Sequence, residues 1–282
     1  MALTFLELDE KIQILDVGAF ATSEVPIYKT LLDNNIAHLN AFEGDKRQIQ
    51  EIKKLYGPRV SIYNDFLFDG SKQIVYFASA ISGMTSLLKP KIEALNFFNG
   101  FNEFGAIEST ESIQTKTLDS IDQIPNIDFI KMDIQGAELT VLKNGLEKIK
   151  YCIGIQLEVS HICLYENQPP FGEVDVWLRS QGFVPHTFLK EKRWSISPTI
   201  FGNNYRIAGN QLLESDVIYV KDPLNLLSLS DRQLKNFAIL SHHCFRSPDL
   251  CIYILIELVK RRVIDREHLD LYCNELNKNT NK

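Results

Sequence analysis

Several features that mark particular classes of protein are missing from this 282-residue sequence. It has no excess of basic residues, because 30 Lys and Arg stand against 36 Asp and Glu and give a net charge of −6. An acidic chain is repelled by phosphate backbones and anionic lipids, so nucleic acid and membrane are disfavoured as partners. The most apolar window, residues 250–259, is far shorter than the roughly 20 residues that a membrane span needs.

Paired cysteines and a leader pattern are also missing. The five cysteines include no C-x-x-C pair and no metal-ligand spacing, which predicts reduced thiols and a cytoplasmic protein. Residues 1–10 have neither the basic start nor the apolar stretch of a signal peptide. The 14 glycines and 10 prolines are too few for a collagenous or low-complexity chain, so we expect an ordinary globular fold.

Short apolar runs alternate with helical patterns along the first 222 residues. This alternation predicts an α/β fold with a mostly parallel sheet built from right-handed crossovers. The expected strands are residues 12–17, 37–42, 60–63, 127–133, 152–159, 183–188 and 217–220. The expected helices between them are residues 25–34, 49–56, 137–148 and 171–181.

Two regions depart from this alternation. Residues 64–126 are predicted to be an insertion, with a hairpin turn at Asp69-Gly70, a strand over 73–78 and a helix over 90–98. After Asp222 the pattern is purely helical, over residues 231–245, 249–262 and 266–276. We therefore expect one domain over 1–222 and a helical extension over 223–282. The helix over 249–262 is apolar around most of its circumference, so it must pack on the chain or on a second copy in a homo-oligomer.

Acidic residues stand where the predicted parallel strands end. In an open parallel sheet, ligands bind beyond the carboxyl ends of the strands. Gly18 follows the first strand, and a glycine there lets the backbone approach a ligand closely. Residues 16–22 contain no further glycine, so the G-x-G-x-x-G fingerprint that seats a pyrophosphate is absent. This argues against NAD or FAD and allows a cofactor without phosphates. The acids at the strand ends are Asp16, Glu43, Asp65, Asp133 and Glu158.

Three of these positions describe a pocket for an adenosine. Glu43 can accept both hydrogen bonds of a ribose diol, and Asp65 can accept one from an adenine amino group. Gly18 lets the backbone approach this ligand closely. S-adenosylmethionine fits this pattern, since its positive sulfonium is compatible with carboxylates. The alternative interpretations are an ordinary tight turn at Gly18, a surface acid at Glu43 and an Asx turn at Asp65.

Further motifs give a resemblance to a known family. They are Asp16-Val17-Gly18-Ala19, Phe42-Glu43, Thr117-Leu118-Asp119, the string from Ile130 to Glu138 (Ile-Lys-Met-Asp-Ile-Gln-Gly-Ala-Glu) and Glu158-Val159. With these motifs, residues 12–222 resemble an FkbM-type S-adenosylmethionine-dependent methyltransferase. Phe20-Ala21-Thr22 departs from the Asn-x-Gly that commonly follows Gly-Ala in this family.

The resemblance implies a class I, Rossmann-like methyltransferase fold with a mostly parallel seven-stranded sheet flanked by helices. It implies methyl transfer from S-adenosylmethionine, most often to a hydroxyl of a sugar, a glycan or a secondary metabolite. The residues predicted to bind the cofactor are Asp16, Gly18, Ala19, Glu43, Asp65, Asp133, Gln135 and Glu138.

Three residues are candidates for catalysis. Asp133 ends the fourth parallel strand, where the transferred methyl group is expected, and Glu158 and His161 follow the next strand. Either Asp133 or His161 is the predicted base, because histidine is suited to deprotonating a hydroxyl near neutral pH. The same three side chains could instead hold a divalent cation, but their spacing is not diagnostic and no metal site is predicted.

The acceptor is not defined by the motifs. Residues 64–126 and a loop over 191–211, which carries Trp194 and Tyr205, are expected to shape its pocket. The predicted partner is a small-molecule or glycan hydroxyl. Two rival interpretations stay open, namely methyl transfer to a different acceptor atom and a non-catalytic binding module that keeps the fold. The departure after Ala19 is the feature that favours the second rival.

Overall fold

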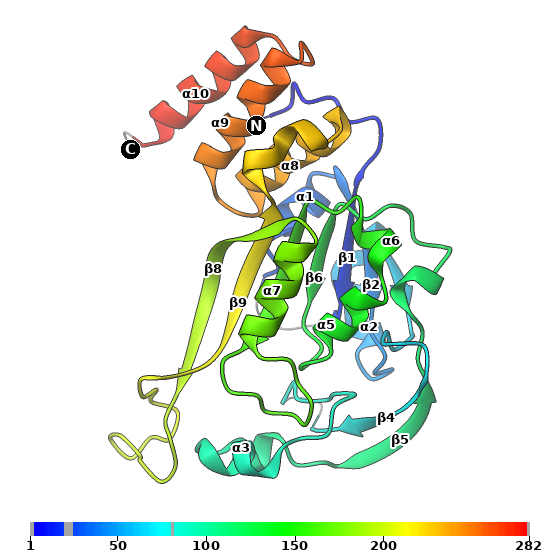
Figure 1. Cartoon of the computed structure of the whole chain (residues 1–282), viewed down its shortest axis with the longest axis vertical. Helices are drawn as coiled ribbons and strands as arrows, with labels where there is room; N and C mark the ends of the chain where they lie inside the picture. Colours follow the sequence, from blue (N-terminus) through cyan, green and yellow to red (C-terminus); the bar gives the residue numbers. More distant parts are fainter. Residues whose placement is uncertain (1–2, 20–24, 80–81, 281–282) are drawn as a thin grey trace.

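A mostly parallel sheet of seven strands forms the centre of the protein in a computed structural model, which describes residues 3–19, 25–79 and 82–280 (Figure 1). The strand order is β3-β2-β1-β6-β7-β9-β8, in which β9 is antiparallel to both of its neighbours and the others are parallel. The strands are β1 Ile12–Val17, β2 Ala37–Phe42, β3 Val60–Tyr63, β6 Phe129–Met132, β7 Gly154–Ser160, β8 Phe183–Trp194 and β9 Gln211–Lys221. This is the class I methyltransferase arrangement that the sequence predicts.

The last two strands are much longer than expected. Their antiparallel pairing runs from Phe183 opposite Lys221 to Trp194 opposite Gln211, and it extends past the body of the sheet as a long arm (Figure 1). Residues 191–194, expected in a loop, therefore belong to β8. Charged residues dominate this part of β8, because its outer portion is largely solvent-exposed and needs no apolar alternation.

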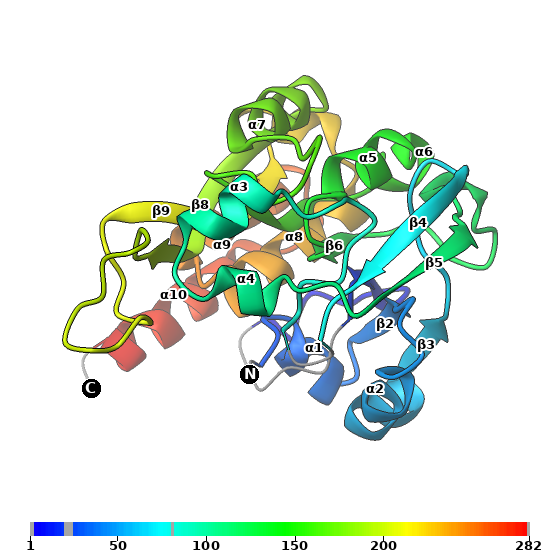
Figure 2. The same ribbon diagram turned by 90° about the horizontal axis from the view of Figure 1, so that it is seen from below.

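The insertion forms a small separate layer below the carboxyl ends of the sheet (Figure 2). Strand β4, Lys72–Phe77, pairs antiparallel with β5, Ser109–Gln114, so the expected hairpin at Asp69-Gly70 is wrong. Polar, exposed β5 gave no strand signal in the sequence. Two short helices, α3 Ile92–Phe97 and α4 Phe101–Phe104, pack against Trp194 of the β8–β9 arm.

Helices cover both faces of the sheet. One face carries α1 Lys29–Asp33 and α2 Ile49–Tyr56, and the other carries α5 Glu138–Lys143, α6 Leu146–Ile149 and α7 Phe171–Ser180. The helix expected over 137–148 is broken because Gly145 passes so close to Leu118 that an added Cβ would lie 2.6 Å from its side chain. The helix expected over 25–34 is confined to α1.

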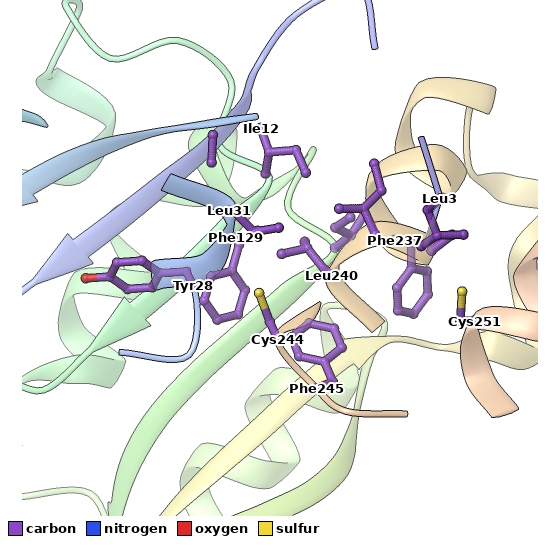
Figure 3. Packing of buried hydrophobic residues seen from close by; sticks show 14 of the residues in the cluster. Leu3, Ile12, Tyr28, Leu31, Phe129, Phe237, Leu240, Cys244, Phe245 and Cys251 are labelled. Atoms are coloured by element: carbon purple, nitrogen blue, oxygen red, sulfur yellow. The ribbon is translucent and has the colours of Figure 1, made fainter. Parts of the chain in front are cut away.

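The C-terminal helices are part of the same hydrophobic core as the sheet. They are α8 Asp231–His243, α9 Pro248–Lys260 and α10 Arg266–Thr280, preceded by a 3-10 segment over Pro223–Ser228. A capping box formed by Ser230 and Gln233 starts α8. Phe237, Leu240 and Phe245 share a cluster with Ile12 and Phe129 of the sheet (Figure 3). The α9 side chains that the chain itself buries in this cluster are Leu250, Cys251, Ile254, Leu255 and Leu258.

A buried polar network fixes α8 to the sheet. Asp128 is fully buried and accepts two hydrogen bonds from Arg232, at 2.8 and 3.1 Å, and one from Asn236 at 3.0 Å. The backbone N–H of Gln13 donates another at 2.8 Å. A carboxylate desolvated this completely is stable only with such partners, so the network specifies how α8 docks. No helix of the described residues is both long and apolar enough to cross a bilayer.

Candidate active site

A cavity of about 780 Å³ opens at the carboxyl ends of the parallel strands, and residues of the insertion and of the β8–β9 arm also line it. Its wall contains seven of the ten residues predicted for the site. They are Asp16, Gly18, Glu43, Asp65, Asp133, Gln135 and Glu158. Of the remaining three described residues, Ala19, Glu138 and His161, none lines the cavity. The motif Phe20-Ala21-Thr22 lies outside the described residues.

Gly18 occupies the point where the ends of β1 and β6 come closest. Its φ is +75°, and a Cβ at this position would lie 2.0 Å from the backbone oxygen of Asp133. No side chain fits there, so the glycine is required by the approach of the two strands as well as by its left-handed backbone. The approach brings Asp133 next to the cavity floor formed by β1.

Asp16 is held in a buried ion pair. Its carboxylate lies 3.1 Å from Nζ of Lys131 on the neighbouring strand and also accepts the hydroxyl of Tyr28. Burial alone would lower the pKa of Lys131, but attraction to Asp16 and Asp133 outweighs it and the pKa is raised. Lys131 therefore keeps its positive charge in the floor of the cavity.

Glu43 ends β2 with a largely buried carboxylate. Its Oε1 accepts the backbone N–H of Asp45 at 2.7 Å, and among the described residues no group donates to Oε2. Asn64 fixes the backbone here by donating to the carbonyl of Glu43 at 2.7 Å. Burial raises the pKa of Glu43 to about 7, although the hydrogen bond from Asp45 opposes this shift. One carboxylate oxygen is thus left to accept hydrogen bonds from a ligand.

The third strand adds Asp65 and an aromatic ring that the sequence analysis did not single out. Asp65 lies 3.0 Å from Nζ of Lys116. Phe66 follows it and lies so close to Gly44 that a Cβ on Gly44 would be 2.4 Å from the ring. Both residues line the cavity. An aromatic residue after a short strand is a common pattern, so only the packing on Gly44 reveals Phe66 as part of the wall.

Gln135 joins the carboxylates at the ends of β6 and β7. Its Nε2 donates to Asp133 Oδ1 at 2.9 Å and to Glu158 Oε1 at 3.3 Å. The hydroxyl of Tyr165 lies 3.0 Å from Gln135 Oε1, and Ser86 donates to the Gln135 carbonyl at 2.8 Å. Because only the amide nitrogen can donate to two carboxylates, these contacts fix the orientation of the side chain. Gln135 also has φ +56°, a left-handed conformation that is uncommon outside glycine.

The side of the cavity formed by β7, β8 and β9 is rich in carboxylates. Glu158 lies opposite Asp216 of β9, and Glu214 forms an ion pair with Lys192 of β8. Burial, together with repulsion from Asp133 and Glu214, raises the pKa of Glu158 well above its usual range. Burial and Asp133 likewise raise the pKa of Asp216 to about 6. Burial and the neighbouring carboxylates thus favour the protonated form of Glu158.

Glu138 and His161 have other surroundings. Glu138 accepts hydrogen bonds from the backbone N–H groups of Ile134, at 2.9 Å, and Gly136, at 3.2 Å. Its side chain therefore stabilises the turn that follows β6. His161 Nε2 lies 2.9 Å from the hydroxyl of Ser215, and its ring packs against the edge of Phe171. The structure therefore does not bring His161 together with Asp133 in the cavity wall.

The cation alternative has no support in the described ranges, which contain no cluster of His, Cys, Asp and Glu arranged to hold a metal ion. The structure adds wall residues that the sequence analysis did not single out for the site. These are Lys131, Gln156, Glu214 and Asp216. Phe101, Phe104 and Lys192 also line the cavity, and they lie in the two regions that were expected to shape the acceptor pocket. Gln156 Oε1 is buried without a hydrogen-bond partner among the described residues, which marks it as a group that a ligand could satisfy.

Comparison with known proteins gives one family match and several similar folds. The family model described as "Methyltransferase FkbM domain" matches residues 7–185. No curated protein matches the sequence. Magnesium protoporphyrin IX methyltransferase from Synechocystis PCC 6803 is 9% identical, with a TM-score of 0.38 and coverage of 76% of this chain and 71% of that one. Sp1610 from Streptococcus pneumoniae, a candidate tRNA (m1A22) methyltransferase, is 12% identical with a TM-score of 0.38, covering 95% and 90%.

Proposed function

The chain belongs to the FkbM methyltransferase family, and from that premise we propose that it transfers the methyl group of S-adenosylmethionine to a hydroxyl of a sugar, a glycan or a secondary metabolite. The family supports the methyltransferase activity and its cofactor. The choice of a hydroxyl acceptor is our proposal and rests on the side chains of the cavity.

The residues present fit the cofactor. Gly18 lines the cavity and leaves no room for a side chain against the Asp133 backbone, and Glu43 keeps one carboxylate oxygen without a partner among the described residues. We propose that Glu43 accepts the ribose hydroxyls, that Asp65 and Phe66 border the adenine, and that Asp16 and Asp133 face the positively charged end. When bound, S-adenosylmethionine supplies a methyl group that is already activated for transfer to a nucleophile.

The observation that carries the proposal is the bridge from Gln135 to Asp133 and Glu158. A base must lie within hydrogen-bond reach of the proton that it removes, and both carboxylates line the cavity. Because burial keeps the pKa of Glu158 high, we assign the proton from the acceptor hydroxyl to Asp133 and a protonated, hydrogen-bonding role to Glu158. Gln135 holds the pair in place. His161, the other predicted base, lies outside the wall and has no part in this proposal.

The acceptor wall suits a ligand with several hydroxyl groups. Glu158, Asp216 and the unpartnered Gln156 Oε1 all accept hydrogen bonds, as hydroxyl donors require. Phe101, Phe104 and Trp194 supply an aromatic side to the same cavity. Methyl transfer to an amine is the alternative activity, since an amine also donates to carboxylates.

The test begins with calorimetric titration of S-adenosylhomocysteine, because absence of binding would favour the non-catalytic module. Transfer of labelled methyl is then measured with nucleotide sugars, free glycans and matched amino sugars as acceptors. Asp133→Asn should lower turnover by roughly 10²–10⁴-fold, the contribution of a general base, while S-adenosylhomocysteine still binds. Transfer to amines alone, or full turnover in the variant, would contradict the proposal.

Two further expectations stand beside the activity. We propose that residues 1–222 form the methyltransferase domain and that residues 223–282 form a helical extension of it. We also propose that the protein works in the cytoplasm, which its five free cysteines support. A homo-oligomer through the C-terminal helices is also proposed, because Tyr253 and Leu271 leave large apolar side chains exposed there. Light scattering of the full chain measures this, and a monomer at all concentrations would contradict it.

A further inference from the structure

Arg246 brings the C-terminal extension into the cavity wall. It follows α8, is exposed, and lines the cavity together with Cys244. Both residues lie outside the range 7–185 that the family model matches. Cys244 packs in the same core as Tyr28, whose hydroxyl donates to Asp16 (Figure 3). Arg246 therefore lines the same cavity as Asp16 and Lys131.

Arg246 differs from Lys131 and Lys192 of the cavity in having no side-chain partner among the described residues. Lys131 is paired with Asp16, and Lys192 is paired with Glu214. Within the described part of the chain, the guanidinium of Arg246 makes neither a hydrogen bond nor an ion pair. A guanidinium without a partner at the rim of an acidic cavity is available to bind an anion in a bidentate manner.

The geometry points to an anion-binding role for Arg246: we propose that it binds the α-carboxylate of S-adenosylmethionine, an inference that rests on the proposed function. The cofactor carries three kinds of group, and the wall offers a complement to each. Glu43 suits the ribose diol, the carboxylates of Asp16 and Asp133 suit the positive groups, and the amino-acid carboxylate needs a cation. Of the cations described in the wall, Lys131 and Lys192 are held in ion pairs and Lys190 interacts with Asp216, whereas Arg246 has no such partner among the described residues.

The chain provides a closely matched control in Arg262. Both arginines follow a helix of the C-terminal extension, both are exposed, and both have left-handed backbones, with φ +53° at Arg246 and +60° at Arg262. Arg262 does not line the cavity. Replacing either arginine by glutamine removes the same charge from the same kind of helix end, so only the role in the cavity differs.

The experiment compares two ligands by calorimetry. One is S-adenosylhomocysteine, and the other is its decarboxylated analogue, which keeps the amine and lacks the carboxylate. Arg246→Gln should weaken S-adenosylhomocysteine by about five- to tenfold, the range for a partly solvated charge pair, and should hardly change binding of the analogue. Arg262→Gln should change neither affinity. Thermal unfolding of both variants verifies that they are folded.

The outcomes separate the two proposals. If the unmodified protein fails to bind S-adenosylhomocysteine, the proposed function is wrong. If it binds, but Arg246→Gln weakens both ligands equally or neither, the carboxylate assignment is wrong while the function stands. If Arg246→Gln binds S-adenosylhomocysteine with normal affinity but has a raised KM for a negatively charged acceptor, the assignment is also wrong. Arg246 then binds the anionic group of the acceptor and not that of the cofactor.

Discussion

The two halves of the cavity wall are built in different ways. On the parallel side, Asp16, Glu43 and Asp133 lie at or just after the ends of strands, where the chain turns away from the sheet. On the antiparallel side, Lys192, Glu214 and Asp216 come from inside β8 and β9, because these strands continue past the sheet and pass along the cavity. The parallel half therefore repeats a feature of the fold, whereas the antiparallel half depends on the length of one hairpin.

This difference matches the roles that we expect for the two halves, which are cofactor binding on the parallel side and acceptor binding on the antiparallel side. Strand ends of a parallel sheet provide the general ligand position of open α/β folds, and we place the cofactor there. A hairpin can change its length and side chains without disturbing the sheet, which suits the recognition of a particular acceptor. The division can be tested by changing one residue at a time on each side.

The largest expected effect is the loss of protein stability when the lysine of an ion pair in the cavity wall is replaced. Lys131→Met leaves Asp16 buried with Tyr28 as its remaining partner, so the free energy of unfolding should fall by about 3–5 kcal/mol. Lys192→Met should cost less, because the Lys192 side chain is 42% exposed against 20% for Lys131. Urea unfolding of both variants gives the comparison. Equal losses would show that the two halves do not differ in rigidity.

The next effect concerns the cofactor. Glu43→Gln keeps the shape of the side chain but removes the charge that accepts the ribose hydroxyls. The affinity for S-adenosylhomocysteine should fall by about 1.5–3 kcal/mol, the value of a hydrogen bond to a charged group, with the KM of the acceptor unchanged. Calorimetry and steady-state kinetics measure the two quantities. Unchanged cofactor affinity in a folded variant would refute the assignment of Glu43.

The matching change on the antiparallel side is Asp216→Asn. Asp216 lines the cavity on β9, opposite Glu158, and its replacement keeps the size of the side chain. We expect the KM of the acceptor to rise by roughly 5- to 30-fold, about 1–2 kcal/mol, while S-adenosylhomocysteine binds as before. If this variant instead loses cofactor affinity, the two halves share the cofactor and the division between them is wrong.

The same difference explains how far the sequence analysis could go. The strands of the sheet and the acids of the parallel half follow from local patterns, because a buried strand followed by an acid and a turn is recognisable in the sequence. The class I arrangement of the seven strands was implied by the family resemblance and not by these patterns. The Lys192–Glu214 pair was missed because it depends on the register of two strands separated by 16 residues, residues 195–210. The partner of β4 was missed for the same reason, and the position of Arg246 depends on how α8 docks through Asp128. Non-local pairing leaves no local signal.

The smallest expected effect is a pH dependence of the cofactor affinity, which we assign to Glu43 in the parallel half. Burial raises the pKa of Glu43 to about 7, so at pH 6 most molecules carry a neutral side chain there and at pH 8 most carry the carboxylate. The carboxylate is the form that accepts both ribose hydroxyls. The affinity for S-adenosylhomocysteine should therefore rise by up to about tenfold from pH 6 to pH 8 and then level off.

Stability must change in the opposite direction. A carboxyl group whose pKa is higher in the folded than in the unfolded state stabilises the fold below the unfolded pKa, and this contribution is lost as the pH rises through 7. Glu43→Gln cannot titrate, so it should flatten the part of both profiles that Glu43 contributes, whereas Asp216→Asn should keep the rise in cofactor affinity. Calorimetry and urea unfolding at pH 6, 7 and 8 measure both quantities. If the affinity of Glu43→Gln for S-adenosylhomocysteine still rises from pH 6 to pH 8, another group titrates. The assignment of this pH dependence to Glu43 and the parallel half is then wrong.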